Sequence, residues 1–239
     1  GVSGPALGEH LRRRLAAAAR IERTRGDWLW HAGLRLERRS GYDVRATAAA
    51  AIAYRLDEVL TIRGGAGNVF RAPTFTELYY EDPNNRGNRR LQPETGWAWD
   101  VGLEVDGGRW HGRVATFARY EDDRIEWARP AAEPVWRALN VASGTVRGVE
   151  LSTGRHLRGG HQLGAGYTGL LKTATLAPGY EGKYALLVPR HQLWLRAQAA
   201  LPQRVRLAAT GRYREHAAGP DGFRDAFVLD ARLAWEGPH

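Results

Sequence analysis

Apolar and polar residues alternate with a period of two along most of this chain. Between Trp97 and Val105 the odd positions carry aromatic or aliphatic side chains, whereas the even positions carry small or charged ones. Successive side chains of a β-strand point to opposite faces of a sheet, so this period predicts strands rather than helices. The same alternation, with small or polar residues on the second face, recurs in 14–22, 45–55, 161–172, 192–199, 204–214 and 227–235.

Over the whole chain the pattern predicts about eleven strands. They cover 10–24, 28–39, 44–56, 59–69, 96–106, 109–121, 138–155, 160–173, 188–200, 204–215 and 225–236. Short turns alternate with longer connections, and the long loops are expected at 70–95, 122–137, 174–187 and 216–224. This alternation is typical of an up-and-down antiparallel meander. We therefore predict an all-β chain that forms one unit over residues 1–239.

Strand length and the chemistry of the two faces favour a transmembrane barrel over a soluble sandwich. Strands of about 11–15 residues exceed the 5–6 that are usual in globular sheets, but they suffice for the 9–11 that cross a bilayer. Free sheet edges are not tolerated in lipid, and bacterial single-chain barrels have even strand numbers. Eleven strands are therefore expected to be a portion of a larger barrel. Aromatic residues near strand ends resemble interfacial girdles: they are Trp30, Tyr54, Trp97, Trp110, Tyr120, Tyr213 and Trp235.

Composition narrows the chemistry. The 239 residues include no Cys, which excludes disulfides and thiolate metal sites. The formal charge of +9 would by itself favour a nucleic-acid partner, but arginines that line a water-filled interior account for it equally. A soluble basic β-protein that binds nucleic acid therefore stays a remote alternative.

Several absences also shape the expectations. The eight histidines are scattered, and neither a catalytic triad nor a nucleophile elbow is present. We predict no metal site, no cofactor and no enzyme activity. Met is missing even at position 1, and residues 1–8 show no signal-peptide pattern, so we expect a piece of a longer chain.

The segment from Phe70 to Glu94 interrupts the strands and carries a distinctive pattern. It begins with FRAPTFTELYY at 70–80 and ends in GNRRLQPET at 87–95. Together with Asn140, RGVEL at 147–151, VPRH at 188–191 and LDARL at 229–233, it resembles the barrel signature of TonB-dependent outer-membrane receptors, in their cobalamin-receptor and siderophore-receptor branches. The residues that match this signature, for which we expect structural roles, are Phe70, Arg71, Pro73, Glu77, Leu78, Gly87, Asn88, Leu91, Pro93, Glu94, Asn140, Gly148, Glu150, Pro189 and Asp230.

The resemblance implies a fold, a location and a function. The chain would supply about 11 strands, near the tenth to the twentieth, of a 22-stranded barrel in the bacterial outer membrane. The barrel would serve energy-coupled uptake of a scarce nutrient, such as a metal–siderophore complex or a cobalamin-like molecule. A passive pore or an adhesin barrel is the alternative.

The same resemblance implies a set of partners. They are outer-membrane lipid, a plug domain, TonB of the inner-membrane coupling complex, and a small-molecule ligand such as a metal chelate, with no nucleic acid among them. No part of this chain resembles the family's plug domain, its coupling box, or its first and last barrel strands.

Two interpretations of the long loops stay open. In 70–95, which we expect to lie outside the cell, Pro73, Pro83 and Pro93 are expected to prevent regular strand pairing. The residues there either shape the loop or contact a ligand by stacking and hydrogen bonding. The candidate ligand contacts are Tyr79, Tyr80, Asn84, Asn85 and Arg86, together with Trp127 and Trp136 in 122–137; Arg89 and Arg90 offer further donors. On the polar face we expect ion-pair ladders among Asp100, Glu104, Arg113, Glu150, Arg190, Arg206, Asp230 and Arg232.

Overall fold

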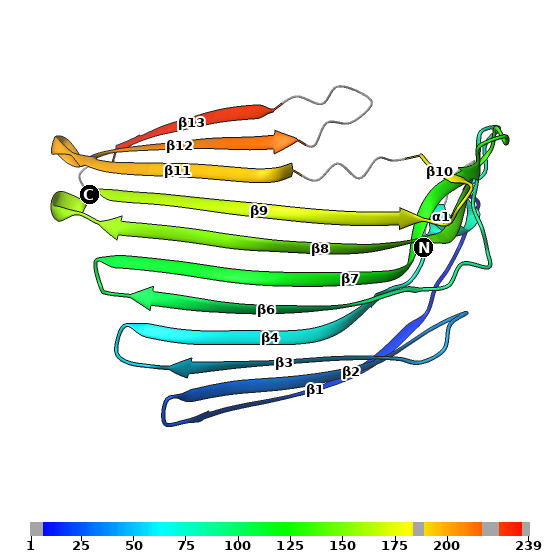
Figure 1. Cartoon of the computed structure of the whole chain (residues 1–239), viewed down its shortest axis with the longest axis horizontal. Coiled ribbons are helices and arrows are strands. Elements are labelled where there is room, and N and C mark those ends of the chain that lie inside the picture. The colour runs from blue at the N-terminus through cyan, green and yellow to red at the C-terminus, as the bar shows by residue number, and fades with distance from the viewer. Residues whose placement is uncertain (1–6, 184–188, 217–224, 236–239) are drawn as a thin grey trace.

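Eleven long strands form one antiparallel sheet, in which each strand pairs with its neighbours along the chain (Figure 1). The computed structural model describes residues 7–183, 189–216 and 225–235. The long strands are β1 (Arg14–Arg25), β2 (Trp28–Arg39), β3 (Arg45–Arg55), β4 (Leu60–Arg71), β6 (Glu94–Asp106), β7 (Trp110–Pro130), β8 (Trp136–His156), β9 (Gln162–Leu176), β11 (Pro189–Leu201), β12 (Val205–His216) and β13 (Ala226–Trp235). The predicted meander is confirmed. Val188, which the sequence places at the start of a strand, and the loop residues 217–224 lie outside the described residues.

Five short elements lie between these strands. They are the helix α1 (Phe75–Tyr79), the strands β5 (Asn85–Arg86) and β10 (Tyr180–Gly182), and two 3₁₀ turns at Arg158–Gly160 and Pro202–Arg204. No helix in the described ranges is long and apolar enough to cross a membrane. The two strands are absent from the main order of the sheet: β5 pairs with β8, and β10 pairs with β7.

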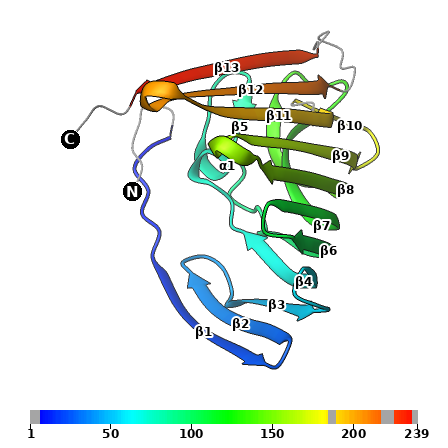
Figure 2. The same cartoon turned by 90° about the vertical axis from the view of Figure 1, so that its left-hand side faces the viewer.

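The sheet curves into a trough, and its concave face surrounds α1 and β5 (Figure 2). Its other face exposes large apolar side chains over most of the strands, for example Val101 on β6, Leu151 on β8 and Leu229 on β13. A soluble monomer rarely exposes so extensive an apolar surface. The curved sheet is therefore a portion of a barrel with its apolar face outward.

Phe117 is an exception to the apolar–polar alternation of β7. Its ring lies on the polar face, directly over Gly148 of the neighbouring strand, where a Cβ would come within 2.5 Å of Phe117 Cζ. The missing side chain at Gly148 makes room for a ring that would otherwise collide with β8. This gives the signature residue Gly148 a structural role.

Ion pairs on the sheet form local groups. Glu104 pairs with Arg63 and lies 3.9 Å from Arg113, and Arg212 contacts Asp230 at 2.7 Å. Another group, which the sequence did not reveal, surrounds the buried carboxylate of Glu37. Its partners are Arg14, Arg35 and Arg39 of β1 and β2.

Two loop predictions are wrong. Residues 122–137 are not a loop, because β7 continues to Pro130 and β8 begins at Trp136. The strand register shifts between Glu121 and Ile125, and Asp123 there has a φ of +52°. Such a bulge breaks the period of two, which hid the continuation of the strand.

The second correction concerns the prolines of 70–95. They do not exclude pairing throughout, because Asn85 and Arg86 pair in parallel with Trp136 and Arg137. Only two residues take part, and they lie between Pro83 and Pro93, where no proline interrupts them.

Candidate functional site

The long-loop end of the sheet carries a folded structure that we call the loop cap, defined as residues 72–93, 122–143 and 177–183. Its hydrophobic core consists of Leu78, Leu91, Ile125 and Ala138, with Tyr79 and Trp127 packed against it. Leu91, Pro73 and Pro93 are the largest side chains in the described residues that are fully buried. The signature segment therefore supplies much of a small core, although it lies between two strands of the sheet.

Helix α1 begins with a complete capping box. The Thr74 side chain accepts a hydrogen bond from the Glu77 amide at 3.2 Å, and the Glu77 carboxylate accepts one from the Thr74 amide at 2.7 Å. Both contacts satisfy amides that a helix start leaves unpaired. Gly87 closes the other end, because a Cβ there would lie 2.8 Å from the backbone of Leu78 and Tyr79. Glycine at this position lets the returning chain pack against the helix.

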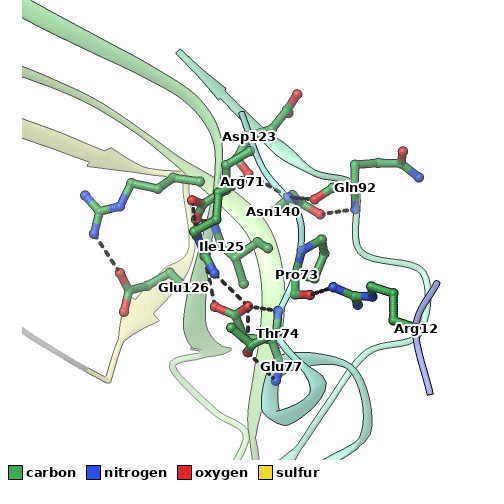
Figure 3. Close-up of polar contacts among 12 residues, drawn as sticks. Arg12, Arg71, Pro73, Thr74, Glu77, Gln92, Asp123, Ile125, Glu126 and Asn140 are labelled. Carbon is green, nitrogen blue, oxygen red and sulfur yellow. Dashed lines mark hydrogen bonds and ion pairs between the residues drawn. The ribbon is translucent and has the colours of Figure 1, made fainter. Parts of the chain in front are cut away.

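Arg71 joins the cap to the sheet through two carboxylates (Figure 3). Its guanidinium contacts Glu77 at 2.9 Å and Glu94 at 2.5 Å. Burial opposes ionisation of Glu77, but the hydrogen bonds from Arg71 and Thr74 outweigh it and lower the pKa of this carboxyl. Glu94 also accepts a hydrogen bond from the Ile125 amide at 2.8 Å. One arginine thus holds α1, β6 and the end of β7 together.

Asn140 fixes the bulge of β7 (Figure 3). Its Nδ2 donates to the carbonyls of Gln92 at 3.0 Å and Asp123 at 2.6 Å, and its Oδ1 accepts from the Gln92 amide at 2.9 Å. A side-chain amide offers both donors and an acceptor, and all are used here. This residue connects the signature segment to the strand distortion.

Strand neighbours are exchanged between the sheet and the cap. In the sheet, the order is β6–β7–β8–β9. In the cap, β10 pairs with β7 at Tyr180–Gly182, and β5 pairs with β8 at Asn85–Arg86. The segment β10, which follows β9 along the chain, therefore lies beside β7. The segment β5, which precedes β6, lies beside β8. The two segments therefore cross at the β7–β8 hairpin, whose register shifts form a bulge that increases twist.

Most of the predicted ligand contacts are engaged within the cap. Lys183 donates to the Asn85 side chain and lies over the ring of Trp127, which in turn meets the edge of Tyr80. Arg129 lies 4.3 Å from the ring centre of Trp136. The backbone oxygen of Asn84 accepts from the Trp136 amide, and Arg86 pairs with Glu81 at 3.2 Å. These contacts favour structural roles for the six residues.

Tyr79 differs from the other candidates, because it also faces an open cleft. Its ring stacks on His10 at a centroid distance of 3.6 Å, and Arg89 lies 5.5 Å from its centre. The cleft is lined by 14 residues, including Arg12, Tyr42 and Arg45, and has a volume of about 510 Å³. No group of three metal-ligating side chains occurs in the described parts of the chain.

Sequence reasoning missed the residues on the far side of this cleft. Tyr42 and Asp43 belong to the connection 40–43 between two of the predicted strands. Leu11 and Arg12 lie just before β1 in a region predicted to be strand. In the sequence, these residues are marked only by arginines that lie close to aromatic residues. This pattern does not indicate which loop they contact.

A family comparison identifies the fold. Residues 12–237 match the family described as TonB dependent receptor-like, beta-barrel. The chain belongs to the TonB-dependent receptor β-barrel family.

Known relatives of this TonB-dependent receptor barrel include transporters and receptors. The vitamin B12 transporter BtuB of Photobacterium profundum is 29% identical over 131 residues, which is 54% of this chain and 21% of the relative. The siderophore receptor PirA of Pseudomonas aeruginosa superposes with a TM-score of 0.72 at 17% identity, over 93% of this chain and 40% of that structure. A variant of the ferric enterobactin receptor PfeA of the same species, in complex with enterobactin, gives 0.74 at 15%, over 91% and 37%. The chain thus spans less than half the length of these proteins, and the structural likeness shows the fold alone.

In this receptor barrel, nine of the fifteen signature residues gather in one place, in or at the base of the cap. They are Arg71, Pro73, Glu77, Leu78, Gly87, Leu91, Pro93, Glu94 and Asn140. Asn88 joins them through its amide, which donates to the Glu77 carbonyl at 2.8 Å. Phe70 contacts Arg39, and Gly148, Glu150, Pro189 and Asp230 lie on the sheet away from the cap. Most of the residues that resemble the family signature therefore hold the segment 70–95 in place.

Proposed function

We propose that the chain forms part of the barrel wall and of the extracellular cap of an outer-membrane receptor that takes up a scarce nutrient by energy-coupled transport. The observation that carries this proposal is the combination of an outward apolar face on successive antiparallel strands with a cap at one end only. The apolar face suits lipid contact. The cap and its cleft suit ligand capture before transport, so the proposal is a receptor and transporter and not an enzyme.

Partners follow from this proposal. Outer-membrane lipid would cover the apolar face, a plug domain would occupy the concave side, and TonB would supply the energy coupling. The relatives named as a vitamin B12 transporter and siderophore receptors support a metal chelate or a cobalamin-like molecule as the ligand. Nucleic acid is not expected as a partner.

Uptake by cells that express the complete protein tests the proposal. We expect the protein in the outer-membrane fraction, and uptake of a chelate or cobalamin that stops when TonB is deleted or the proton gradient is collapsed. Recovery as a soluble monomer without detergent would reject the location. Uptake that persists without TonB would favour a passive pore instead.

A further inference from the structure

The cleft beside Tyr79 is built by three separate segments of the chain. The residues before β1 contribute Leu11 and Arg12, and the β2–β3 connection contributes Tyr42 and Asp43. The signature segment contributes Phe75, Leu78 and Tyr79 from α1, together with residues 89–92. A volume of about 510 Å³ lies in the range of small-molecule sites, which is about 300–1,000 Å³.

Charge in this cleft is strongly one-sided. Its lining includes four arginines, at positions 12, 45, 89 and 90, and one carboxylate, Asp43. Nη1 of Arg12 donates to the Pro73 carbonyl at 2.8 Å, which positions that guanidinium. Among the described residues no carboxylate pairs with Arg45, Arg89 or Arg90, and Nε of Arg45 is buried without a hydrogen-bond partner. Positive charge in a concave site with low-dielectric walls concentrates the field and attracts anions.

Aromatic rings lie between these charges. Arg12 lies 4.9 Å from the ring centre of Phe75 and 5.7 Å from that of Tyr42. Arg89 lies over Tyr79, whose ring also stacks on His10. Burial raises the pKa of the Tyr42 phenol, although Arg12 opposes this, so the hydroxyl remains a donor at neutral pH. Guanidinium groups held by rings and carbonyls lose little conformational freedom when they bind an anion.

We infer that this cleft binds a polyanionic chelate with aromatic rings, the chemistry of a tris-catecholate iron complex, in preference to a neutral ligand. Arginines with no carboxylate partner offer charge-assisted, forked hydrogen bonds to anionic oxygens. The rings of Tyr42, Phe75 and Tyr79 add aromatic surface to the lining. A neutral ligand would desolvate the same guanidinium groups without returning a charge partner, which is unfavourable.

This inference rests on the proposed uptake function and names the ligand class for it. It differs from what the vitamin B12 transporter relative alone would suggest, because cyanocobalamin carries no net charge. The arginines of the cleft are the feature that separates the two ligand classes.

The test measures binding and uptake of three probes by cells that express the complete protein. The probes are an iron(III) tris-catecholate, which is a polyanion, a neutral iron(III) tris-hydroxamate and cyanocobalamin. We expect the tris-catecholate to bind, and the double substitution Arg89→Gln and Arg90→Gln to weaken its binding at least about tenfold. Binding should also weaken as salt is raised.

A matched control removes the same charge at the opposite end of the barrel. Arg155→Gln with Arg158→Gln changes two exposed residues beside a short turn and should leave binding within about twofold, because screened charges this far away contribute little. Since Arg89 and Arg90 are exposed, their substitution should not prevent folding, which unchanged surface expression would verify.

Each other outcome overturns the inference. Equal weakening in both double variants would mean long-range attraction and no specific cleft, and unchanged binding in the Arg89 and Arg90 variant would place the ligand elsewhere. Uptake of cyanocobalamin or the tris-hydroxamate, with no binding of the tris-catecholate, would reject the ligand class and leave the uptake function intact. Uptake of none of the three would count against the proposed function itself.

Discussion

The sheet and the loop cap are made by the same strands but are held together differently. Along the sheet, large apolar side chains such as Leu229 and Leu233 are exposed, and the buried apolar residues of its regular part are the small Ala115 and Ala118. In the cap, Leu78, Leu91 and Ile125 are buried among one another. Backbone pairing thus stabilises the first region, with lipid as the expected cover of its apolar face, whereas a hydrophobic core stabilises the second.

This difference teaches that a membrane barrel can carry a water-soluble type of fold at its rim. The cap has the features of a small globular unit: a capped helix, a partly buried ion-pair network and strand pairs between segments distant in sequence. Substitutions should therefore affect the stability of the two regions by different amounts.

Removal of a core side chain should separate the two regions most clearly. Leu91→Ala removes a fully buried side chain and should lower the free energy of opening of the cap by about 3 kcal/mol. Leu229→Ala, on the outward face, should cost less than about 1 kcal/mol, because its side chain is 66% exposed and stays in apolar surroundings in lipid. Hydrogen exchange of the Gly87 and Asn88 amides in detergent micelles reports cap opening. Equal losses would refute the distinction.

Loss of Arg71 should have the next largest effect. Arg71→Ala leaves Glu77 and Glu94 without their cation, and we expect the cap to be destabilised by about 2 kcal/mol. Arg71→Lys should recover only part of this, because an ammonium group cannot form the forked contacts to two carboxylates. As the matched control on the sheet, Arg212→Ala breaks an exposed pair with Asp230 and should cost under about 1 kcal/mol. Full recovery by lysine would show that charge alone matters.

Asn140 tests whether the bulge depends on its side chain. Asn140→Ala should cost about 1–2 kcal/mol, because the Gln92 amide and the Asp123 carbonyl lose their partner. Asn140→Asp keeps the acceptor but loses both donors, so it should be at least as damaging. Exchange of the Gln92 amide, compared with amides in the middle of β12, measures the local effect. A milder loss for aspartate than for alanine would show that the donors are unimportant.

As the pH is lowered, the cap should open at a higher pH than the sheet. At neutral pH this effect is the smallest of the four predicted here. The pKa of Glu77 is lowered in the folded protein, so its stabilisation is fully present above the ordinary glutamate value of about 4.3 and is lost as the pH falls through the lowered pKa. Proteolysis within 72–93 by an acid-active protease should therefore increase below about pH 4. Glu77→Gln should remove this pH dependence while leaving the protein more susceptible throughout. Acid cleavage that is unchanged by this substitution would assign the effect to another group.

Much of the fold could be predicted from the sequence, because a strand with two different faces leaves a period of two. The eleven long strands follow that pattern, and the two short strands carry too few residues to show it. The end of β7 was missed for a related reason: the register shifts between Glu121 and Ile125 interrupt the alternation. The alternation of residues along one strand does not predict a strand whose path is determined by pairing with its neighbour.

The candidate site shows the same limit. Residues such as Arg71, Leu91 and Asn140 could be assigned structural roles from the family resemblance, but the resemblance does not say that they meet. Trp127 and Trp136 could not be assigned to ligand contact or to loop packing, because a sequence does not distinguish an exposed tryptophan ring from a packed one. Tyr42 and Arg45 were missed, since only the curvature of the sheet brings them to the signature segment.

The exchange of strand neighbours at the β7–β8 hairpin has a consequence for how such receptors could be recombined. The strand β5 pairs with β8 and the strand β10 pairs with β7, so the β7–β8 hairpin holds both of these segments. The hairpin, β5 and β10 therefore cannot be replaced independently. A chimera that takes only one of these segments from a relative would lose the backbone pairing between that segment and its neighbour. A chimera that takes all three segments together would keep both pairings. Tolerated insertions should concentrate instead in residues 131–134, at the exposed tip of the hairpin.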